Sequence, residues 1–142
     1  MGGQIHIRIK SREDLTRAAE HYHDAVFAPE DARHNATTST FSLTLWRETE
    51  GHVVRSRLPL LKRRVDHWAR SVLTFKDCLR ADIQVRDPGV WPLLNLVDYD
   101  PATGKIHFEI DGPMEITLYV SSLDGMLEDT GEVASEPGGH AA

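Results

Sequence analysis

The side chains best suited to chemistry lie close together in the first quarter of the chain. His21, Asp24 and His34 offer two imidazoles and a carboxylate, which are ligand types that Zn, Ni or Fe accept. On a helix, His21 and Asp24 are three residues apart and share a face, so both could reach one ion while His34 returns from a following loop. His23 is two residues from His21 and would point away. The competing interpretation is a solvated helix end, where histidine suits the C-terminal dipole.

A basic segment in the middle of the chain is the second candidate. The chain has a net charge of −6, yet residues 55–80 carry eight basic residues against two acids, a local charge of +6. Arg63, Arg64 and Trp68 combine cations with an aromatic ring and are the residues predicted to contact a partner, for which an acidic protein surface is suited. The acidic chain shows no nucleic-acid-binding motif, which argues against nucleic acid. The alternative is a solvated face whose cations neutralise the acidic remainder.

Other reactive residues lack the patterns that catalysis would need. No Gly-x-Ser-x-Gly motif occurs. Cys78 is the one cysteine, so no intrachain disulfide can form, and its surroundings favour a small buried hydrophobe over a reactive thiol. Residues 103–105 (Thr-Gly-Lys) lack the upstream glycine of a phosphate loop and predict a hairpin turn. The sequence therefore predicts no cofactor and favours a non-enzymatic role.

The elements around the histidines begin with a strand and a helix. Residues 4–9 alternate between polar side chains and isoleucine, which predicts a strand. Ser11 then precedes apolar residues at helical spacing, which predicts a helix over 12–26 that ends before Pro29. The polar stretch that follows, residues 28–40, predicts a loop.

The rest of the chain predicts mostly strands. A turn is expected at 48–51, and the segment 58–66 fits helix, strand or loop equally well. Trp46 falls on the polar side of its strand and is expected to close a second core layer. Strands are predicted over 41–47, 52–57, 67–76, 79–85, 93–99, 105–110 and 114–121, the last three as a meander.

These elements predict an α+β fold, predominantly an antiparallel β-sheet or small sandwich with one N-terminal helix packed on it. We expect a single globular domain over residues 1–127 and an acidic, disordered C-terminal tail over 128–142. The chain shows no secretory signal and no apolar run long enough to cross a bilayer, so a cytoplasmic location without membrane contact is expected.

The leading functional hypothesis is a small non-catalytic binding or protein-interaction module that contacts an acidic protein or forms a homodimer. It rests on the segregated charge and on the lack of a complete catalytic motif. Two alternatives stay open: a small metal-dependent enzyme that uses the His/Asp cluster, and a small-ligand carrier, because curved antiparallel sheets can enclose a cavity.

Overall fold

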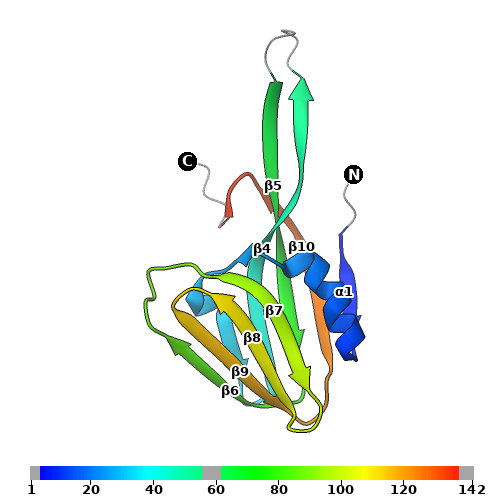
Figure 1. The fold of residues 1–142 in the computed structure, drawn as a ribbon, viewed down its shortest axis with the longest axis vertical. Helices are drawn as coiled ribbons and strands as arrows, with labels where there is room; N and C mark the ends of the chain where they lie inside the picture. Colours follow the sequence, from blue (N-terminus) through cyan, green and yellow to red (C-terminus); the bar gives the residue numbers. More distant parts are fainter. Residues whose placement is uncertain (1–3, 56–61, 138–142) are drawn as a thin grey trace.

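One antiparallel sheet makes up most of the molecule (Figure 1). The computed structural model describes the backbone of residues 4–55 and 62–137, and the side chains of residues 4–49 and 68–137. In this part of the chain the strands run in the order β1-β10-β5-β4-β2-β7-β8-β9-β6, with β3 paired to β4. The elements are β1 (His6–Ile9), α1 (Arg12–Tyr22), β2 (Ala25–Val26), a 3-10 turn (Pro29–Asp31), β3 (Ala32–Asn35), β4 (Thr40–Arg55), β5 (Lys62–Phe75), β6 (Cys78–Val85), β7 (Leu93–Asp100), β8 (Lys105–Asp111), β9 (Met114–Val120) and β10 (Gly125–Ala134).

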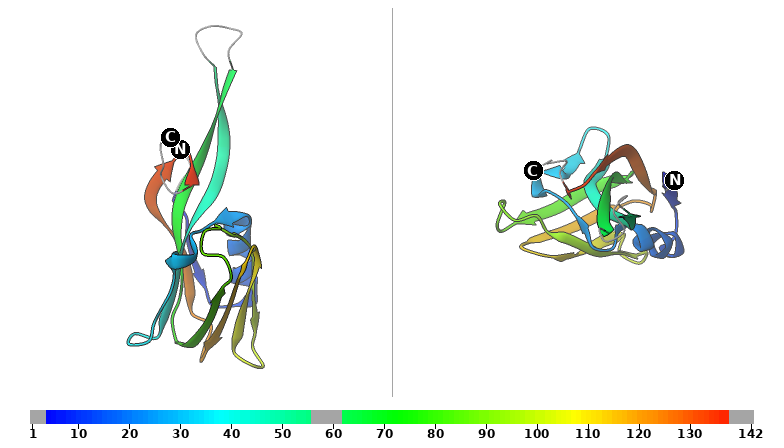
Figure 2. Two further views of the ribbon diagram at one scale, coloured as in Figure 1. Left: turned by 90° about the vertical axis from the view of Figure 1, so that its left-hand side faces the viewer. Right: turned by 90° about the horizontal axis from the view of Figure 1, so that it is seen from above.

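The sheet curls so that its two halves face each other across one core (Figure 2). Strands β7, β8, β9 and β6 form one layer, and β4, β5 and β10 form the other. Phe108 of β8 meets Phe41 of β4 and Phe75 of β5 edge-on, at centroid distances of 5.5 and 6.1 Å. All three rings are buried, so this contact joins the two layers through the hydrophobic core. The predicted α+β fold with one N-terminal helix is confirmed.

Helix α1 covers the open side of the curled sheet and is shorter than predicted. Ser11 caps it as expected, because its hydroxyl accepts a hydrogen bond from the Asp14 amide at 3.2 Å. The helix ends at Tyr22 and not at residue 26, since Asp24 has a left-handed backbone with φ of 65°. Ala25 and Val26 then pair with β7 as strand β2. Strand pairing thus replaces the last helical turn.

The longest strands, β4 and β5, form a hairpin that projects well beyond the body of the sheet (Figure 1). The turn predicted at 48–51 is wrong: β4 continues through it, and a register shift makes Glu50 and Gly51 together oppose Asp66. The turn-like residues therefore form a β-bulge inside a strand. Residues 62–66, which the sequence left open, belong to β5, whereas 58–61 lie outside the described residues. We call residues 49–55 and 62–67 the β4–β5 arm.

The acidic C-terminal segment also differs from expectation. Strand β10 runs to Ala134, paired with β1 as far as Glu128 and with β5 as far as Ala134, so the prediction of disorder from residue 128 is wrong for 128–134. Acidic composition suggested a solvated tail, but these carboxylates find partners in the sheet. The pairs are His6–Glu128, Arg47–Asp129 and Arg70–Glu132. Residues 138–142 lie outside the described residues.

Asp129 is the most heavily bonded of these carboxylates. Its oxygens accept hydrogen bonds from Arg47 Nε at 3.0 Å and Nη2 at 2.6 Å, from the Ser71 hydroxyl, and from the Ile5 amide at 3.0 Å. The Asp129 side chain is 5% exposed and that of Arg47 10%. Burial alone would raise the pKa of Asp129, but the hydrogen bonds outweigh it and the pKa lies below its usual value. One carboxylate thus ties β4, β5, β10 and the N-terminal segment together.

We expect Asp129→Asn to lower the free energy of unfolding by about 3 kcal/mol at neutral pH, because it leaves the Arg47 charge buried without a counter-ion. The difference from wild type should be complete above the ordinary pKa of aspartate, about 3.9, and shrink as the pH falls below it, since protonation of wild-type Asp129 removes the same interaction. Urea unfolding across this pH range measures both effects.

Asp82→Asn is the matched control, because it removes one charge from the exposed Arg80–Asp82 pair. It should cost no more than about 1 kcal/mol at any pH. Equal losses in the two variants would show that the Asp129 network adds nothing beyond a surface ion pair.

Candidate functional site

The predicted metal ligands do not come together. Asp24 lies in the left-handed turn after α1, where its Oδ2 is 3.2 Å from Nδ1 of His23, so the helical spacing to His21 is lost. His34 is on β3, and its Nε2 lies 2.9 Å from the carbonyl oxygen of Cys78. Residues 4–55 and 62–137 contain no group of three or more His, Cys, Asp or Glu side chains that could hold a metal ion. The His21, Asp24 and His34 cluster therefore has no structural basis.

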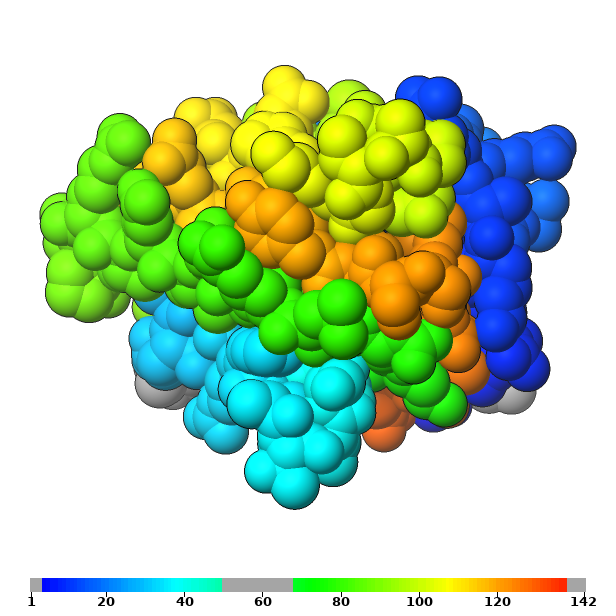
Figure 3. All heavy atoms as spheres, turned by 90° about the horizontal axis from the view of Figure 1, so that it is seen from below, coloured from blue at the N-terminus to red at the C-terminus, as the bar shows by residue number. Residues whose placement is uncertain are grey.

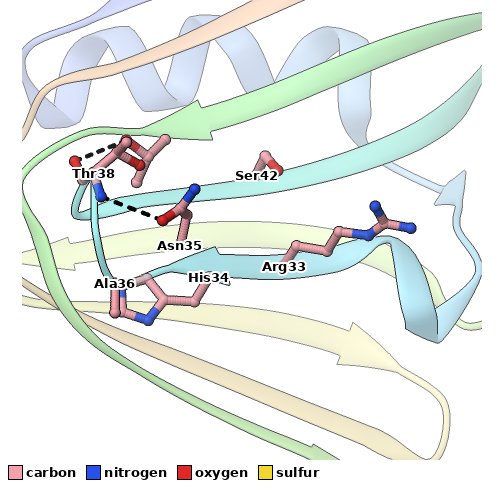
Figure 4. A pocket seen from close by; sticks show the side chains of 7 residues that line it. Arg33, His34, Asn35, Ala36, Thr38 and Ser42 are labelled. Carbon is pink, nitrogen blue, oxygen red and sulfur yellow. Dashed lines mark hydrogen bonds between the residues drawn. The ribbon is translucent and has the colours of Figure 1, made fainter.

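A polar cavity of about 640 Å³ lies beside His34, around the turn that joins β3 to β4 (Figure 4). The Asn35 side-chain oxygen accepts hydrogen bonds from the amides of Thr37 and Thr38 at 3.0 and 3.3 Å. Its cation, Arg33, donates to the carbonyl of Glu30 at 3.2 Å. These groups hold the loop and turn together, so we assign this cavity a structural role. It is lined by Arg33, His34, Asn35, Ala36, Thr38, Thr40 and Ser42.

The predicted partner-binding residues lie along β5. Arg63 and Arg64 occupy the β4–β5 arm, where their backbones pair with Val54 and Val53, and their side chains lie outside the described residues. Trp68 sits at the base of the arm, half-buried, with Glu48 on one neighbouring strand and Ala134 on the other. The structure thus places all three on one strand, β5; the sequence predicted a strand at Trp68 and left the local structure of Arg63 and Arg64 open.

Two other arginines of the basic segment 55–80, Arg70 on β5 and Arg80 on β6, have acidic neighbours. Arg70 Nη1 lies 2.9 Å from Glu132, and Arg80 Nε lies 2.9 Å from Asp82. For these two arginines the intramolecular interpretation is correct, because each neutralises an acid of its own chain. The strands of the arm extend past the last pairing with β10.

The edges of the arm carry no further strand in the described residues. Strand β4 pairs with β2 only at Trp46, and β5 pairs with β10 only as far as Trp68. Beyond these points β4 and β5 pair with each other alone. A two-stranded ribbon of this kind exposes backbone donors and acceptors on both sides, which suits contact with another molecule.

A groove that the sequence did not predict lies between α1 and the outer face of β7 and β8. Its volume is about 730 Å³. A register shift between Leu94 and Leu96 turns Leu96 outward, where it is 47% exposed. The sequence of β7 has apolar residues at both odd and even positions. The bulge is what places one of them, Leu96, in this groove. The lining consists of Arg12, Glu13, Leu15, Thr16, Ala19, Tyr22, Leu96, Val97, Asp98, His107 and Glu109.

Tyr22 fixes α1 to the edge of β7 beneath this groove. Strand β2 pairs with β7 only at Leu93 and Leu94, so the next stretch of that edge needs another partner. The Tyr22 hydroxyl accepts a hydrogen bond from the Val97 amide at 3.2 Å and donates to the Leu15 carbonyl at 3.4 Å. Burial raises the pKa of Tyr22 to about 12, so the hydroxyl stays protonated. The groove therefore has a fixed floor.

A smaller cavity of about 380 Å³ continues the groove across β8 and β9, since Asp98 and His107 line both. At its far side the Tyr119 ring is flanked by Arg80 and Lys105, whose charged groups lie 5.1 and 5.6 Å from the ring centroid. Both cations therefore already have an aromatic contact. Figure 3 shows α1 and the β7–β8 region side by side at one corner of the molecule, seen from below.

We expect Tyr22→Phe to lower the free energy of unfolding by about 1–3 kcal/mol, because it leaves the buried Val97 amide without an acceptor. The Val97 amide should also exchange with solvent faster. Tyr119→Phe is the control, since it keeps the ring between two cations, and it should change stability by no more than about 0.5 kcal/mol. Unchanged exchange at Val97 in Tyr22→Phe would contradict the assigned role.

Within the described residues, no helix has the length and apolar character needed to cross a membrane. No protein-family model, no curated protein and no solved structure matches this chain. The case for any function therefore comes from the residues themselves, and two features stand out: the β4–β5 arm and the groove beside α1.

Proposed function

We propose that the protein is a non-catalytic interaction module that binds an acidic protein partner through the β4–β5 arm. The observation that supports it is the projection of β4 and β5 beyond every strand that flanks them in the described residues (Figures 1 and 2). A two-stranded ribbon is marginally stable in water by itself. Its length is therefore better explained by contact with a second molecule than by the needs of the core.

The charge of the arm favours an acidic surface. Its described strands carry four basic residues, Arg55, Lys62, Arg63 and Arg64, against the two acids Glu50 and Asp66. The chain as a whole has a net charge of −6, so the arm is a positive extension of a negative body. Such charge segregation orients an approaching acidic partner toward the arm and repels it from the body.

Strand pairing supplies a second source of affinity. The free edges of the arm can accept a strand of the partner, since main-chain hydrogen bonds are the basis of β-augmentation. Trp68 lies where the arm meets the sheet and is half-buried, a position in which an aromatic ring can anchor an interface while remaining packed in the unbound protein.

The double substitution Arg63→Glu/Arg64→Glu tests the proposal. We expect it to reduce capture of the main partner from native extract by at least tenfold, with wild-type binding lost progressively as salt is raised. The control is Arg8→Glu/Arg17→Glu, which changes net charge by the same amount on exposed arginines of the body. Quantitative mass spectrometry of salt-eluted fractions gives the readout.

Equal capture by both double variants would overturn the assignment to the arm. A partner set made of basic proteins or nucleic acid would contradict the acidic-partner proposal. Sedimentation of the pure protein at low and high salt tests whether the acidic partner is a second copy of the same chain. In that case wild type would associate at low salt, and Arg63→Glu/Arg64→Glu would remain monomeric.

A further inference from the structure

We propose a second binding site, separate from the arm: the groove between α1 and the outer face of β7–β8 binds a small organic ammonium ion that carries an apolar group. Its volume of about 730 Å³ lies within the range of small-molecule sites. The proposal does not depend on the function assigned to the arm, because the two surfaces share no lining residue.

The apolar part of the ligand is indicated by the floor of the groove. Leu15 and Val97 are buried beneath it, and Leu96 stands 47% exposed because the β-bulge turns it outward. Ala19 also lines the groove, and its small side chain leaves space there for a ligand. An exposed leucine held by a bulge against a helix gives an apolar group of the ligand a surface to cover.

The positive charge of the ligand is indicated by the rim. Three carboxylates, Glu13, Asp98 and Glu109, line the groove together with one guanidinium, that of Arg12. Arg12 already has Asp98 as its neighbour, with Nη2 3.4 Å from Oδ1. In the part of the chain that the structure describes, no hydrogen bond or ion pair joins Glu13 or Glu109 to a cation. Two carboxylates therefore remain available to an ammonium group.

An anionic ligand fits the same groove poorly. Arg12 is the one fixed cation among the lining residues, and it is partly neutralised by Asp98. The neighbouring Lys105 lies over the Tyr119 ring in the smaller cavity, where Asp98 and Asp100 also line the wall. The three carboxylates against one guanidinium in the groove therefore favour a cationic ligand over a carboxylate or phosphate.

The groove is also preorganised. Tyr22 holds α1 against the edge of β7 by two hydrogen bonds, and the capped N-terminus of α1 places Arg12 and Glu13 at one end of the groove. A site whose walls are fixed in the unbound protein loses little conformational entropy when a ligand enters.

Titration with 4-phenylbutylammonium and with 4-phenylbutyrate, followed by amide chemical shifts, tests the proposal. The two probes share an apolar skeleton and differ in charge. We expect the ammonium probe to bind with a dissociation constant of about 1 mM or below and to shift the amides of Leu96, Val97 and Glu109. The carboxylate probe should bind at least tenfold more weakly.

Glu13→Gln/Glu109→Gln should weaken binding of the ammonium probe by about tenfold, because it removes both available charges without changing shape. The control Glu20→Gln/Glu30→Gln removes two acids outside the groove and should leave binding unchanged. Leu96→Gln should weaken binding through the apolar floor. No binding of the ammonium probe, equal binding of both probes, or equal affinity in Glu13→Gln/Glu109→Gln and its control would each overturn the site.

Discussion

The buried carboxylate of Asp129 is the interaction on which the sheet depends. It receives hydrogen bonds from Arg47 on β4, from Ser71 on β5 and from the Ile5 amide, and so joins the first and last strands of the chain to its central hairpin. The β10 register shifts directly after it, between Asp129 and Val133. Because Arg47 and Asp129 lie near the base of the arm, the same network sets where the packed body ends and the ribbon begins.

The sequence predicted most of the strands correctly. The predictions failed where pairing with strands distant in the chain determines the local structure. The alternation of residues 105–110 and 114–121 predicted β8 and β9 well, since each strand has one buried face. The turn at 48–51 and the disorder at 128–134 were wrong for one reason. The polar composition of both segments favoured exposure to solvent, but pairing with β5, and at Glu128 also with β1, determined the structure.

The candidate sites stand differently. Arg63, Arg64 and Trp68 were selected from a run of cations in the sequence, and the structure places them on one strand, while their role in partner binding stays a prediction. The metal prediction depended on a helix reaching Asp24, and a left-handed residue there removed its geometric basis. The one sequence feature related to the groove beside α1 is Leu96, an apolar residue that faces solvent because of a β-bulge in β7. The position of that bulge is set by the pairing of β7 with β8 and is not visible in the sequence.

The position of β10 between β1 and β5 has a consequence for how the chain acquires its structure. The first strand has no hydrogen-bonded neighbour in the sheet, as described, until residues 125–128 have been synthesised. During translation, β4 and β5 can pair early as a local hairpin, whereas closure of the sheet must wait for the C-terminal segment. Closure of the body is therefore expected to follow the release of β10 from the ribosome, with the β5 edge exposed to chaperones or to other nascent chains in the interval.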